Sequence, residues 1–274
     1  MAFAVKFWGV RGSIATPSPR HVEFGGNTSC VEVIAGDEVF VLDCGTGVRN
    51  LGKELMKREI SFANILMSHT HWDHINGFPF FLPAYMEKHN FHMWAGHLLD
   101  DGGIQKIMSG QMTQPMFPVP LAAMRSKIEF HDFRAGEDLP LSKYAKIKTV
   151  LLNHPNGATA YRIEFGGKSM CYVTDTEHVV GKPDQGVLGL IEGADLVIYD
   201  STYTDIEFEA KIGWGHSSWQ EGIRLCHAAN VKSLAIFHHD PEHEDDFMEK
   251  LEMEARATWD GAFVARENMV IKLL

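Results

Sequence analysis

A short segment in the first third of the chain carries four potential metal ligands. Residues 63–67 form an apolar run typical of a buried strand, and this run leads directly into Ser68-His69-Thr70-His71-Trp72-Asp73-His74. Imidazole nitrogens and carboxylate oxygens are ligands that zinc, manganese and iron accept. A lone His-x-His pair is more often an ordinary surface or core pair, but the longer pattern at a strand end favours metal binding. The segment therefore predicts a site for two metal ions whose ligands diverge from one loop.

Further potential ligands follow the ends of later predicted strands. His154 comes after the strand expected at 147–152, and Asp175 comes after the strand expected at 170–174. His238 and His239 follow the strand expected at 233–237. Each of these residues alone would more often belong to a turn than to a metal site. Because the arrangement occurs at four strand ends, we expect the side chains to meet at one site.

The order of the predicted elements is that of a layered α/β domain. No linker, low-complexity tract or short repeat interrupts the sequence, so a single domain over residues 1–274 is expected. The helix near residue 218 should begin at Ser217 or Ser218, with Gln220 and Glu221 placed for a capping box. The other expected elements are strands at 3–8, 29–34, 38–42, 160–165, 196–199 and 269–273, and helices at 48–58, 218–229 and 241–257.

Charge and cysteine content narrow the possible functions. The chain has 25 Lys+Arg against 36 Asp+Glu and a formal net charge of -11, whereas extended binding along a nucleic-acid backbone normally needs a basic stripe. The N-terminal sequence is typical of a first strand rather than a signal peptide, and no apolar run is long enough for a membrane span. These features predict a cytoplasmic protein. Buried free thiols are expected at Cys30, Cys44, Cys171 and Cys226.

The motifs resemble those of the metallo-β-lactamase-fold hydrolases, of which SHTHWDH is the signature. The resemblance extends over residues 3–239 and implies a four-layer αββα sandwich with the site at one edge. Within that superfamily the chain is similar to the phosphodiesterase and tRNase Z-like branch. The stretches that match it, in the same order, are Gly9-Val10-Arg11-Gly12-Ser13, Leu42-Asp43-Cys44-Gly45-Thr46-Gly47, Tyr172-Val173-Thr174-Asp175, Gly215-His216-Ser217-Ser218 and Phe237-His238-His239.

The resemblance implies two metal sites that share one carboxylate, Asp175. The ligands of the first ion would be His69, His71 and His154. Those of the second would be Asp73, His74 and His238. His238 is preferred over His239 because it follows the last apolar residue of its strand. Two divalent ions are therefore expected, with zinc as the first choice and manganese or iron as alternatives.

The resemblance also gives catalytic roles to residues near these ligands. Asp73 would orient the attacking water or accept its proton. His216 resembles the histidine that this branch places beside the leaving group, where it can donate a proton to an alkoxide. Asp200 matches the acidic position that orients this histidine. The alternatives are a locally bonded helix-start residue for His216 and a strand-end turn for Asp200.

Three further features have two interpretations each. Asp43 would orient a ligand histidine or would simply belong to a turn. Asn27, after Gly25 and Gly26, would reach the substrate or would shape a turn. The Met- and Pro-rich segment 108–124, with Phe78, Phe80 and Phe81, would form an apolar lid or pocket wall, or else core or a dimer contact.

The resulting hypothesis is a dinuclear phosphodiesterase in which metal-bound hydroxide cleaves a small anionic phosphodiester, such as a cyclic nucleotide. The motif around His216 favours a phosphodiester, because a proton donor helps to expel an alkoxide. Full tRNA processing is disfavoured, since no Lys/Arg-rich insertion is present to grip a tRNA. The alternatives are a lactone, thioester or other acyl hydrolase, a mononuclear iron oxygenase, and a non-catalytic sensing or binding module. No membrane partner is expected, and a homodimer is compatible with the family.

Overall fold

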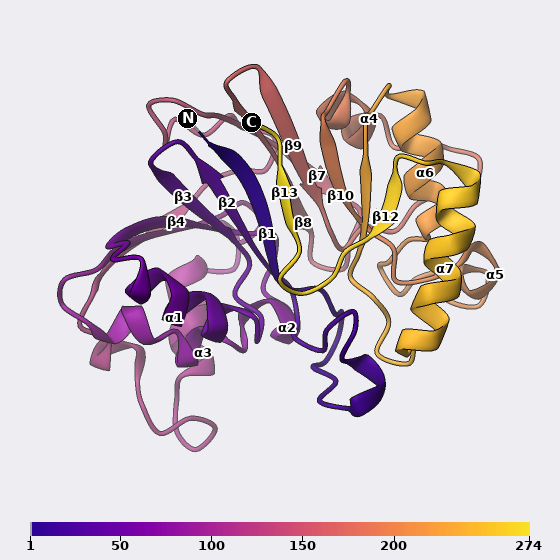
Figure 1. The fold of residues 1–274 in the computed structure, drawn as a ribbon. Helices are drawn as coiled ribbons and strands as arrows, with labels where there is room; N and C mark the ends of the chain where they lie inside the picture. Colours follow the sequence, from indigo (N-terminus) through magenta and orange to yellow (C-terminus); the bar gives the residue numbers. More distant parts are fainter. Residues whose placement is uncertain (1) are drawn as a thin grey trace.

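Two β-sheets packed face to face and covered by helices on both outer sides form four layers (Figure 1). The protein is represented by a computed structural model that describes residues 2–274. Helices α1 (Val48–Lys57) and α3 (Ile104–Gln111) pack on the outer face of the first sheet. Helices α4 (Gln185–Ile191), α6 (Trp219–Ala228) and α7 (Asp245–Thr258) pack on the outer face of the second. The predicted αββα sandwich is confirmed.

The first sheet contains, in spatial order, β13 (Val270–Lys272), β1 (Phe3–Gly9), β2 (Cys30–Ala35), β3 (Glu38–Leu42), β4 (Phe62–Met67), β5 (Asn90–Ala95) and β6 (Lys127–Asp132). Strands β3 to β6 are parallel. Strand β1 runs in the same direction as β3, because β2 is antiparallel to both of them. The carboxyl ends of β1, β3, β4 and β5 therefore lie at one edge of this sheet.

The second sheet contains, in spatial order, β12 (Ala262–Val264), β11 (Leu234–Phe237), β10 (Leu196–Asp200), β9 (Lys168–Val173), β8 (Ala158–Phe165) and β7 (Lys146–Leu152). Strands β9 to β12 are parallel, and β7 shares their direction because β8 is antiparallel to both β7 and β9. An isolated bridge between Arg11 and His239 joins the strand ends of the two sheets. The carboxyl ends of both sheets thus meet at the same edge of the molecule.

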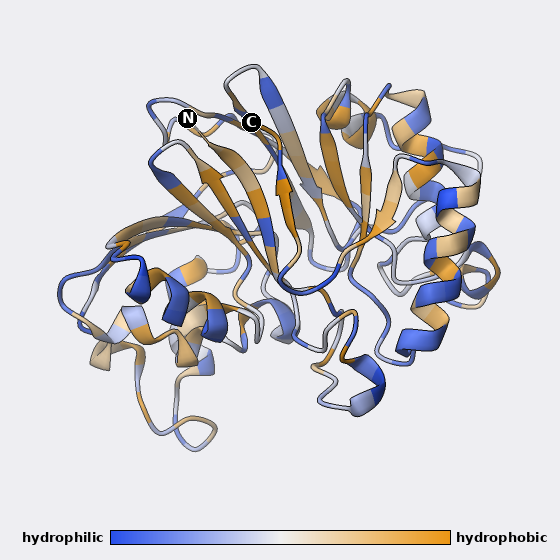
Figure 2. Cartoon of the chain, in the orientation of Figure 1, coloured by the Kyte–Doolittle hydropathy of each residue, from blue (hydrophilic) through white to orange (hydrophobic). Residues whose placement is uncertain are grey.

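Three apolar clusters fill the three spaces between the four layers. Between the sheets, Phe7 of β1 lies against Phe237 of β11, with 6.1 Å between ring centroids. Outside the first sheet, Leu51 and Leu55 of α1 join the second cluster. Outside the second sheet, Ile223 of α6 joins the third. Figure 2 shows hydrophobic strands in both sheets and mixed hydrophilic and hydrophobic residues along α7, the pattern expected of helices that bury one face.

Most predicted elements are confirmed within one or two residues, including the start of α6 at Ser218, but the predicted start of α7 and the predicted capping box of α6 are wrong. Helix α7 begins at Asp245 rather than at residue 241, because His243 N–H donates to Asp240 O in a preceding turn. At α6, Ser218 accepts from Glu221 N–H as the N-cap, but the Glu221 carboxylate bonds Arg224 and completes no capping box. A capping box instead begins α5 (Asp205–Phe208), between Thr204 and Glu207.

Strands β5, β6 and β12 and helices α3 and α4 were not expected from the sequence. In β5 the outward residues Phe91, Met93 and Ala95 are buried under helices, whereas His92 and Trp94 between them are half-buried. This alternation is the period-two pattern of a half-buried strand, and it was the signal available for β5 in the sequence. The remaining short elements are α2 (Trp72–Ile75) and the 3₁₀ turns Pro19–His21, Phe78–Phe80, Leu82–Tyr85 and Leu121–Ala123.

The cysteines are buried and unpaired, as the sequence predicted, and they lie at positions 30, 44, 171 and 226. Burial raises the pKa of the Cys30 and Cys44 thiols well above the usual value, so both stay protonated and act as small apolar core residues. Over residues 2–274, the helices are all too short or too polar to cross a membrane.

Candidate metal centre

The predicted ligands converge at the edge where the carboxyl ends of both sheets meet. The loop after β4 and the start of α2 carry four of them within six residues. The other three follow β7, β9 and β11 of the opposite sheet. The seven residues brought together are His69, His71, Asp73, His74, His154, Asp175 and His238.

One group of donors consists of His69, His71, His154 and Asp175, with one ligand atom of each residue within 4.8 Å of the others. His154 Nε2 lies 3.0 Å from His71 Nδ1, and His69 Nε2 lies 3.5 Å from Asp175 Oδ2. His69 Nε2 is buried and has no hydrogen-bond partner. A buried nitrogen that lacks a partner is costly unless a ligand occupies its lone pair, so this group fits a metal ion.

A second group consists of Asp73, His74 and His238, again within 4.8 Å. His74 Nε2 and His238 Nε2 face each other at 3.2 Å, and His238 Nε2 lies 3.2 Å from Asp73 Oδ2. Asp175 Oδ1 lies 3.3 Å from both of these imidazole nitrogens. Since Asp175 Oδ2 faces the first group, this carboxylate lies between the two groups, as a bridging ligand would.

The electrostatics of the cluster favour a positive charge at its centre. Burial acts to raise the pKa of Asp175, but His238, His74 and His69 outweigh it and hold that pKa well below its usual range. The pKa of Asp73 is also well below its usual range, since His74 and His238 outweigh its burial. Burial lowers the pKa of His69 well below the usual value, which keeps its lone pair available. Two ionised carboxylates among buried imidazoles form a donor set that divalent cations match.

Asp43 supports the cluster from behind. His74 Nδ1 donates to Asp43 Oδ2 at 2.8 Å, which leaves Nε2 of this ring facing the other ligands. The same carboxylate accepts from Ser68 N–H at 2.7 Å and from the Tyr172 hydroxyl at 2.9 Å. Asp43 also has a φ of 62°, in the left-handed region. Both interpretations of this residue therefore apply, because it shapes a turn and also orients His74.

Partly buried His216 and fully buried Asp200 form a pair beside the second group. His216 Nδ1 donates to Asp200 Oδ2 at 3.0 Å, and the His216 ring stacks on His238 with 5.0 Å between centroids. Asp200 is further held by the Thr176 N–H at 3.0 Å and by the Thr202 hydroxyl at 2.7 Å. Burial opposes a charge on His216, but Asp200 outweighs it and raises the pKa of His216 to about 9. The pair therefore presents a protonated imidazole at the edge of the donor cluster.

A family model describing the β-lactamase superfamily domain matches residues 39–239, most of the chain. The chain belongs to the β-lactamase superfamily. Within the superfamily it is a metal-dependent hydrolase of the tRNase Z-like branch. Ribonuclease Z of Haloarcula marismortui is 23% identical over 98% of this chain and 96% of its own length. Ribonuclease Z of Thermoplasma volcanium is 25% identical over 97% of this chain and 95% of its own.

Solved structures with the same fold span the whole length of this superfamily member. The metallo-β-lactamase fold protein YhfI from Bacillus subtilis aligns with a TM-score of 0.74 and 20% identity, covering 98% of each chain. A diphosphatase from the PhnP family aligns with a TM-score of 0.71 and 16% identity, over 99% of this chain and 98% of its own. The short form of human tRNase Z aligns with a TM-score of 0.70 and 20% identity, over 98% of each chain.

Two residues that the sequence offered as further site residues, His239 and Asn27, bond other parts of the chain. His239 Nε2 bonds the Ala265 carbonyl at 2.9 Å, so His238 is the member of the pair that faces the other ligands. The contacts of Asn27 support its interpretation as a residue that shapes a turn. Its amide donates to Glu267 at 3.0 Å, and its backbone N–H donates to the same carboxylate at 2.6 Å. Asn27 therefore ties the N-terminal turn to the C-terminal segment.

Sequence reasoning gave no role to two residues at the donor cluster, one bonded to a donor and one bonded to the loop that carries the donors. Ser13, whose φ is 62°, donates its backbone N–H to Asp73 Oδ2 at 2.8 Å. His97 follows β5, and its Nε2 lies 3.2 Å from the Thr70 hydroxyl. The motif around Arg11 and Gly12 was the available signal for Ser13. No pattern marked His97, because the strand before it was not recognised.

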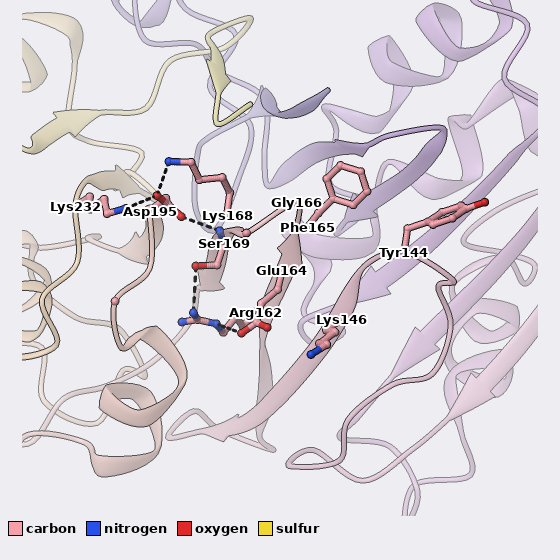
Figure 3. A pocket seen from close by; sticks show the side chains of 12 residues that line it. Tyr144, Lys146, Arg162, Glu164, Phe165, Gly166, Lys168, Ser169, Asp195 and Lys232 are labelled. Carbon is pink, nitrogen blue, oxygen red and sulfur yellow. Dashed lines mark hydrogen bonds and ion pairs between the residues drawn. The ribbon is translucent and has the colours of Figure 1, made fainter. Parts of the chain in front are cut away.

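A second cleft of this superfamily member, with a volume of about 430 Å³, lies at the opposite ends of the second-sheet strands (Figure 3). Lys168 begins β9, and Asp195 and Lys232 precede β10 and β11. Lys232 Nζ and Lys168 Nζ donate to Asp195 at 2.7 and 3.1 Å, and Arg162 donates to Glu164 at 2.7 Å. The acids of this cleft are thus paired with lysine and arginine side chains, whereas the carboxylates of the metal centre face imidazoles.

Proposed function

We propose that the chain is a phosphodiesterase that works with two divalent metal ions, and that residues 1–274 act as one hydrolase domain. The observation that carries the proposal is the position of Asp175, whose two carboxylate oxygens face two separate groups of donors. One carboxylate between two groups of imidazoles suits a pair of ions better than a single ion. Zinc is the first choice, and manganese or iron are the alternatives.

The residues that would hold the ions are those of the two donor groups, with Asp175 between them. When bound, such ions polarise a phosphoryl oxygen and make a water molecule acidic enough to attack near neutral pH. Asp73 is fixed by the Ser13 N–H, so its carboxylate can orient the attacking water and accept its proton. Asp43 and the Gly215 carbonyl hold His74 and His154 through Nδ1, at 2.8 and 2.7 Å.

His216 supplies the proton that the leaving oxygen needs. Its Nδ1 is bound by Asp200, so Nε2 carries the proton that is transferred. The buried Asp200 carboxylate stabilises the protonated ring through a charge-assisted hydrogen bond. A dedicated acid of this kind suits phosphodiester cleavage, because the alkoxide expelled from an alkyl phosphodiester needs a proton. It disfavours a thioester as the substrate, because a thiolate leaves without protonation.

The substrate we propose is short. Curated relatives named ribonuclease Z broaden the candidates to the end of an RNA chain, and the expectation of a small substrate competes with that alternative. The net charge of -11 opposes a long polyanion, since its backbone would gain no general attraction from the protein. Attraction for one phosphate would instead come from the metal centre, which acts locally.

The test is a substrate screen on metal-loaded protein together with a metal count. Bis-(p-nitrophenyl) phosphate, cyclic nucleotides, linear dinucleotides, a precursor tRNA and a lactone are assayed, with Asp73→Ala as the blank. We expect turnover of the small phosphodiesters and two metal ions per chain by plasma mass spectrometry. Preferred cleavage of the tRNA would overturn the small-substrate proposal, and lactone turnover alone would overturn the phosphodiesterase. One iron per chain would contradict the two-metal site, and inactivity on the whole panel would favour a binding module.

A further inference from the structure

An apolar cavity of about 490 Å³ lies directly beside the loop that carries the metal donors. Trp72, which stands between His71 and Asp73 in the sequence, forms part of its wall. The wall continues through Phe80 of a 3₁₀ turn and through Met116 and Phe117 after α3. The cavity therefore joins the metal loop to the Met- and Pro-rich segment, whose role the sequence left open between pocket wall and core.

The Met- and Pro-rich segment 108–124 is partly core and partly cavity wall. Met108, Met112 and Met124 are buried in the cluster beneath the first sheet. Met116 is 72% exposed and lines the cavity. The buried methionines anchor the segment, so that its exposed residues can form a stable wall.

Several large apolar side chains are exposed together at this cavity. Trp72 is 80% exposed and Phe80 is 53% exposed, whereas large aromatic side chains are mostly buried in folded proteins. Phe80 packs edge to face on Phe117 with 5.7 Å between ring centroids, which holds the two rings in place. Contiguous exposed apolar side chains beside a reactive centre are typical of a ligand-binding wall.

The cavity adjoins a second cavity that reaches the metal donors. Thr70 and Ile107 line it, and the same two residues line a neighbouring cavity of about 410 Å³ that includes His69 and His71. A substrate whose phosphate lies at the metal donors can therefore extend across Thr70 into the apolar cavity. None of the described residues that line the apolar cavity is charged, so its occupant is uncharged.

Resting on the proposed phosphodiesterase function, we infer that this cavity binds the nucleobase of a nucleoside phosphodiester. Aromatic side chains such as Trp72 and Phe80 bind bases by stacking, whatever the sequence of the substrate. The side-chain amides of Asn76 and Gln111 also line the cavity, and amides can hydrogen-bond the polar edge of a base. Asn76 Oδ1 accepts from the Thr28 hydroxyl at 3.5 Å, so the Nδ2 group of this amide is the one left to bond a ligand. A hydrocarbon chain would gain nothing from these amides.

The kinetic test uses two substrates with the same leaving group. Thymidine 5′-(p-nitrophenyl phosphate) carries a base, whereas methyl p-nitrophenyl phosphate replaces the nucleoside by a methyl group. The ratio of their kcat/KM values measures recognition of the nucleoside. We expect Trp72→Ala and Phe80→Ala each to lower this ratio by on the order of tenfold, a typical effect of losing one stacking contact. Tyr144→Ala is the matched control, since it truncates a 65% exposed aromatic ring in the opposite cleft.

A binding measurement separates this inference from the proposed function. Calorimetry compares thymidine 5′-phosphate with methyl phosphate on metal-loaded protein, for the wild type and the same three variants. Tighter binding of the nucleotide that is lost in Phe80→Ala but kept in Tyr144→Ala supports the base site, even if neither phosphodiester is hydrolysed. Equal binding of the two phosphates by the wild type overturns the base site. A ratio of kcat/KM that stays the same in both cavity variants overturns it as well.

Discussion

The two ends of the second sheet carry clusters of charged residues that are built in opposite ways. At the amino ends of β9, β10 and β11, Asp195 bonds both Lys168 and Lys232, so its carboxylate is paired within the protein. At the carboxyl ends, Asp73 and Asp175 face imidazoles, and His69 Nε2 has no partner. The first cluster is complete as it stands. The second has a donor set that a cation from solution would complete.

The two clusters also differ in how far water reaches them. Lys232 is 64% exposed at its side chain, so solvent and salt weaken its pairing with Asp195. The imidazole of His74 and the carboxylate of Asp175 are almost fully buried. Interactions in the buried cluster are therefore strong, and its charge must be balanced locally. The exposed pairs at one end of the sheet therefore differ from the buried cluster at the other in both screening and charge balance.

Removing the central carboxylate should have the largest effect. In Asp175→Ala both donor groups lose their common ligand, so we expect fewer than two metal ions per chain. Phosphodiesterase activity should fall by at least about 1,000-fold, because metal catalysis contributes several kcal/mol. Asp195→Ala is the matched control at the opposite end and should keep its metal content and its activity. Equal losses in the two variants would show that the contrast between the clusters is wrong. The measurements are kcat/KM and plasma mass spectrometry.

Replacing His216 tests whether the metal edge also contains a proton donor. We expect His216→Ala to lower kcat on an alkyl phosphodiester by about 100-fold or more, as for other lost general acids. The loss should be much smaller on bis-(p-nitrophenyl) phosphate, because p-nitrophenolate leaves without protonation. Asp200→Asn should show the same dependence on the leaving group in a milder form, since it weakens the 3.0 Å bond to His216.

A loss that is equal for both leaving groups would indicate that His216 positions other residues instead of donating a proton. The metal content of His216→Ala serves as the control. It should equal that of the wild type if His216 lies beside the ligands without being one of them.

A smaller effect is expected from Asp43, which contacts a ligand from behind. Asp43→Asn keeps the shape of the side chain but weakens its bond to His74 Nδ1. Metal affinity should fall by about 10- to 100-fold, as is typical for such supporting carboxylates. Excess zinc should restore much of the activity, unlike in Asp175→Ala. Failure of zinc to restore it, with an intact fold by circular dichroism, would contradict this role.

The convergence of the seven candidate ligands was predictable from the sequence because these residues follow recognisable strand ends. Four of them lie in one run of six residues, and the buried strand before that run was evident from its apolar residues. His238 lies 164 residues from His74, and its position after a predicted strand, together with the resemblance to a known family, joined the two before the structure did. The physical reason for their meeting is that the parallel strands of both sheets end at the same edge.

Contacts that depend on tertiary structure alone were not predictable. Asn27 bonds Glu267, 240 residues away, so no local pattern distinguished this tie from a substrate contact. The wall formed by Trp72, Phe80 and Phe117 is assembled from three separate segments. The opposite cleft was also missed, because its lysines and acids are scattered singly along the chain. Sequence patterns thus identified side chains that share a local motif but not those joined by packing.

The smallest predicted effect concerns stability at the opposite cleft and its dependence on pH. Burial acts to raise the pKa of Asp195, but Lys232, the Ser169 N–H and Lys168 outweigh it and lower that pKa. A carboxylate whose pKa is lower in the folded state stabilises the fold above its unfolded pKa of about 4, and this contribution is lost as pH falls through the folded value. Asp195→Ala should therefore lower the free energy of unfolding by about 1 kcal/mol at pH 7, given the exposure of the lysines.

The difference in this free energy between Asp195→Ala and the wild type should shrink below about pH 4 and in high salt. Urea unfolding at several pH values measures it, and a difference that persists at pH 3 would mean that Asp195 acts by packing, as a buried neutral group would.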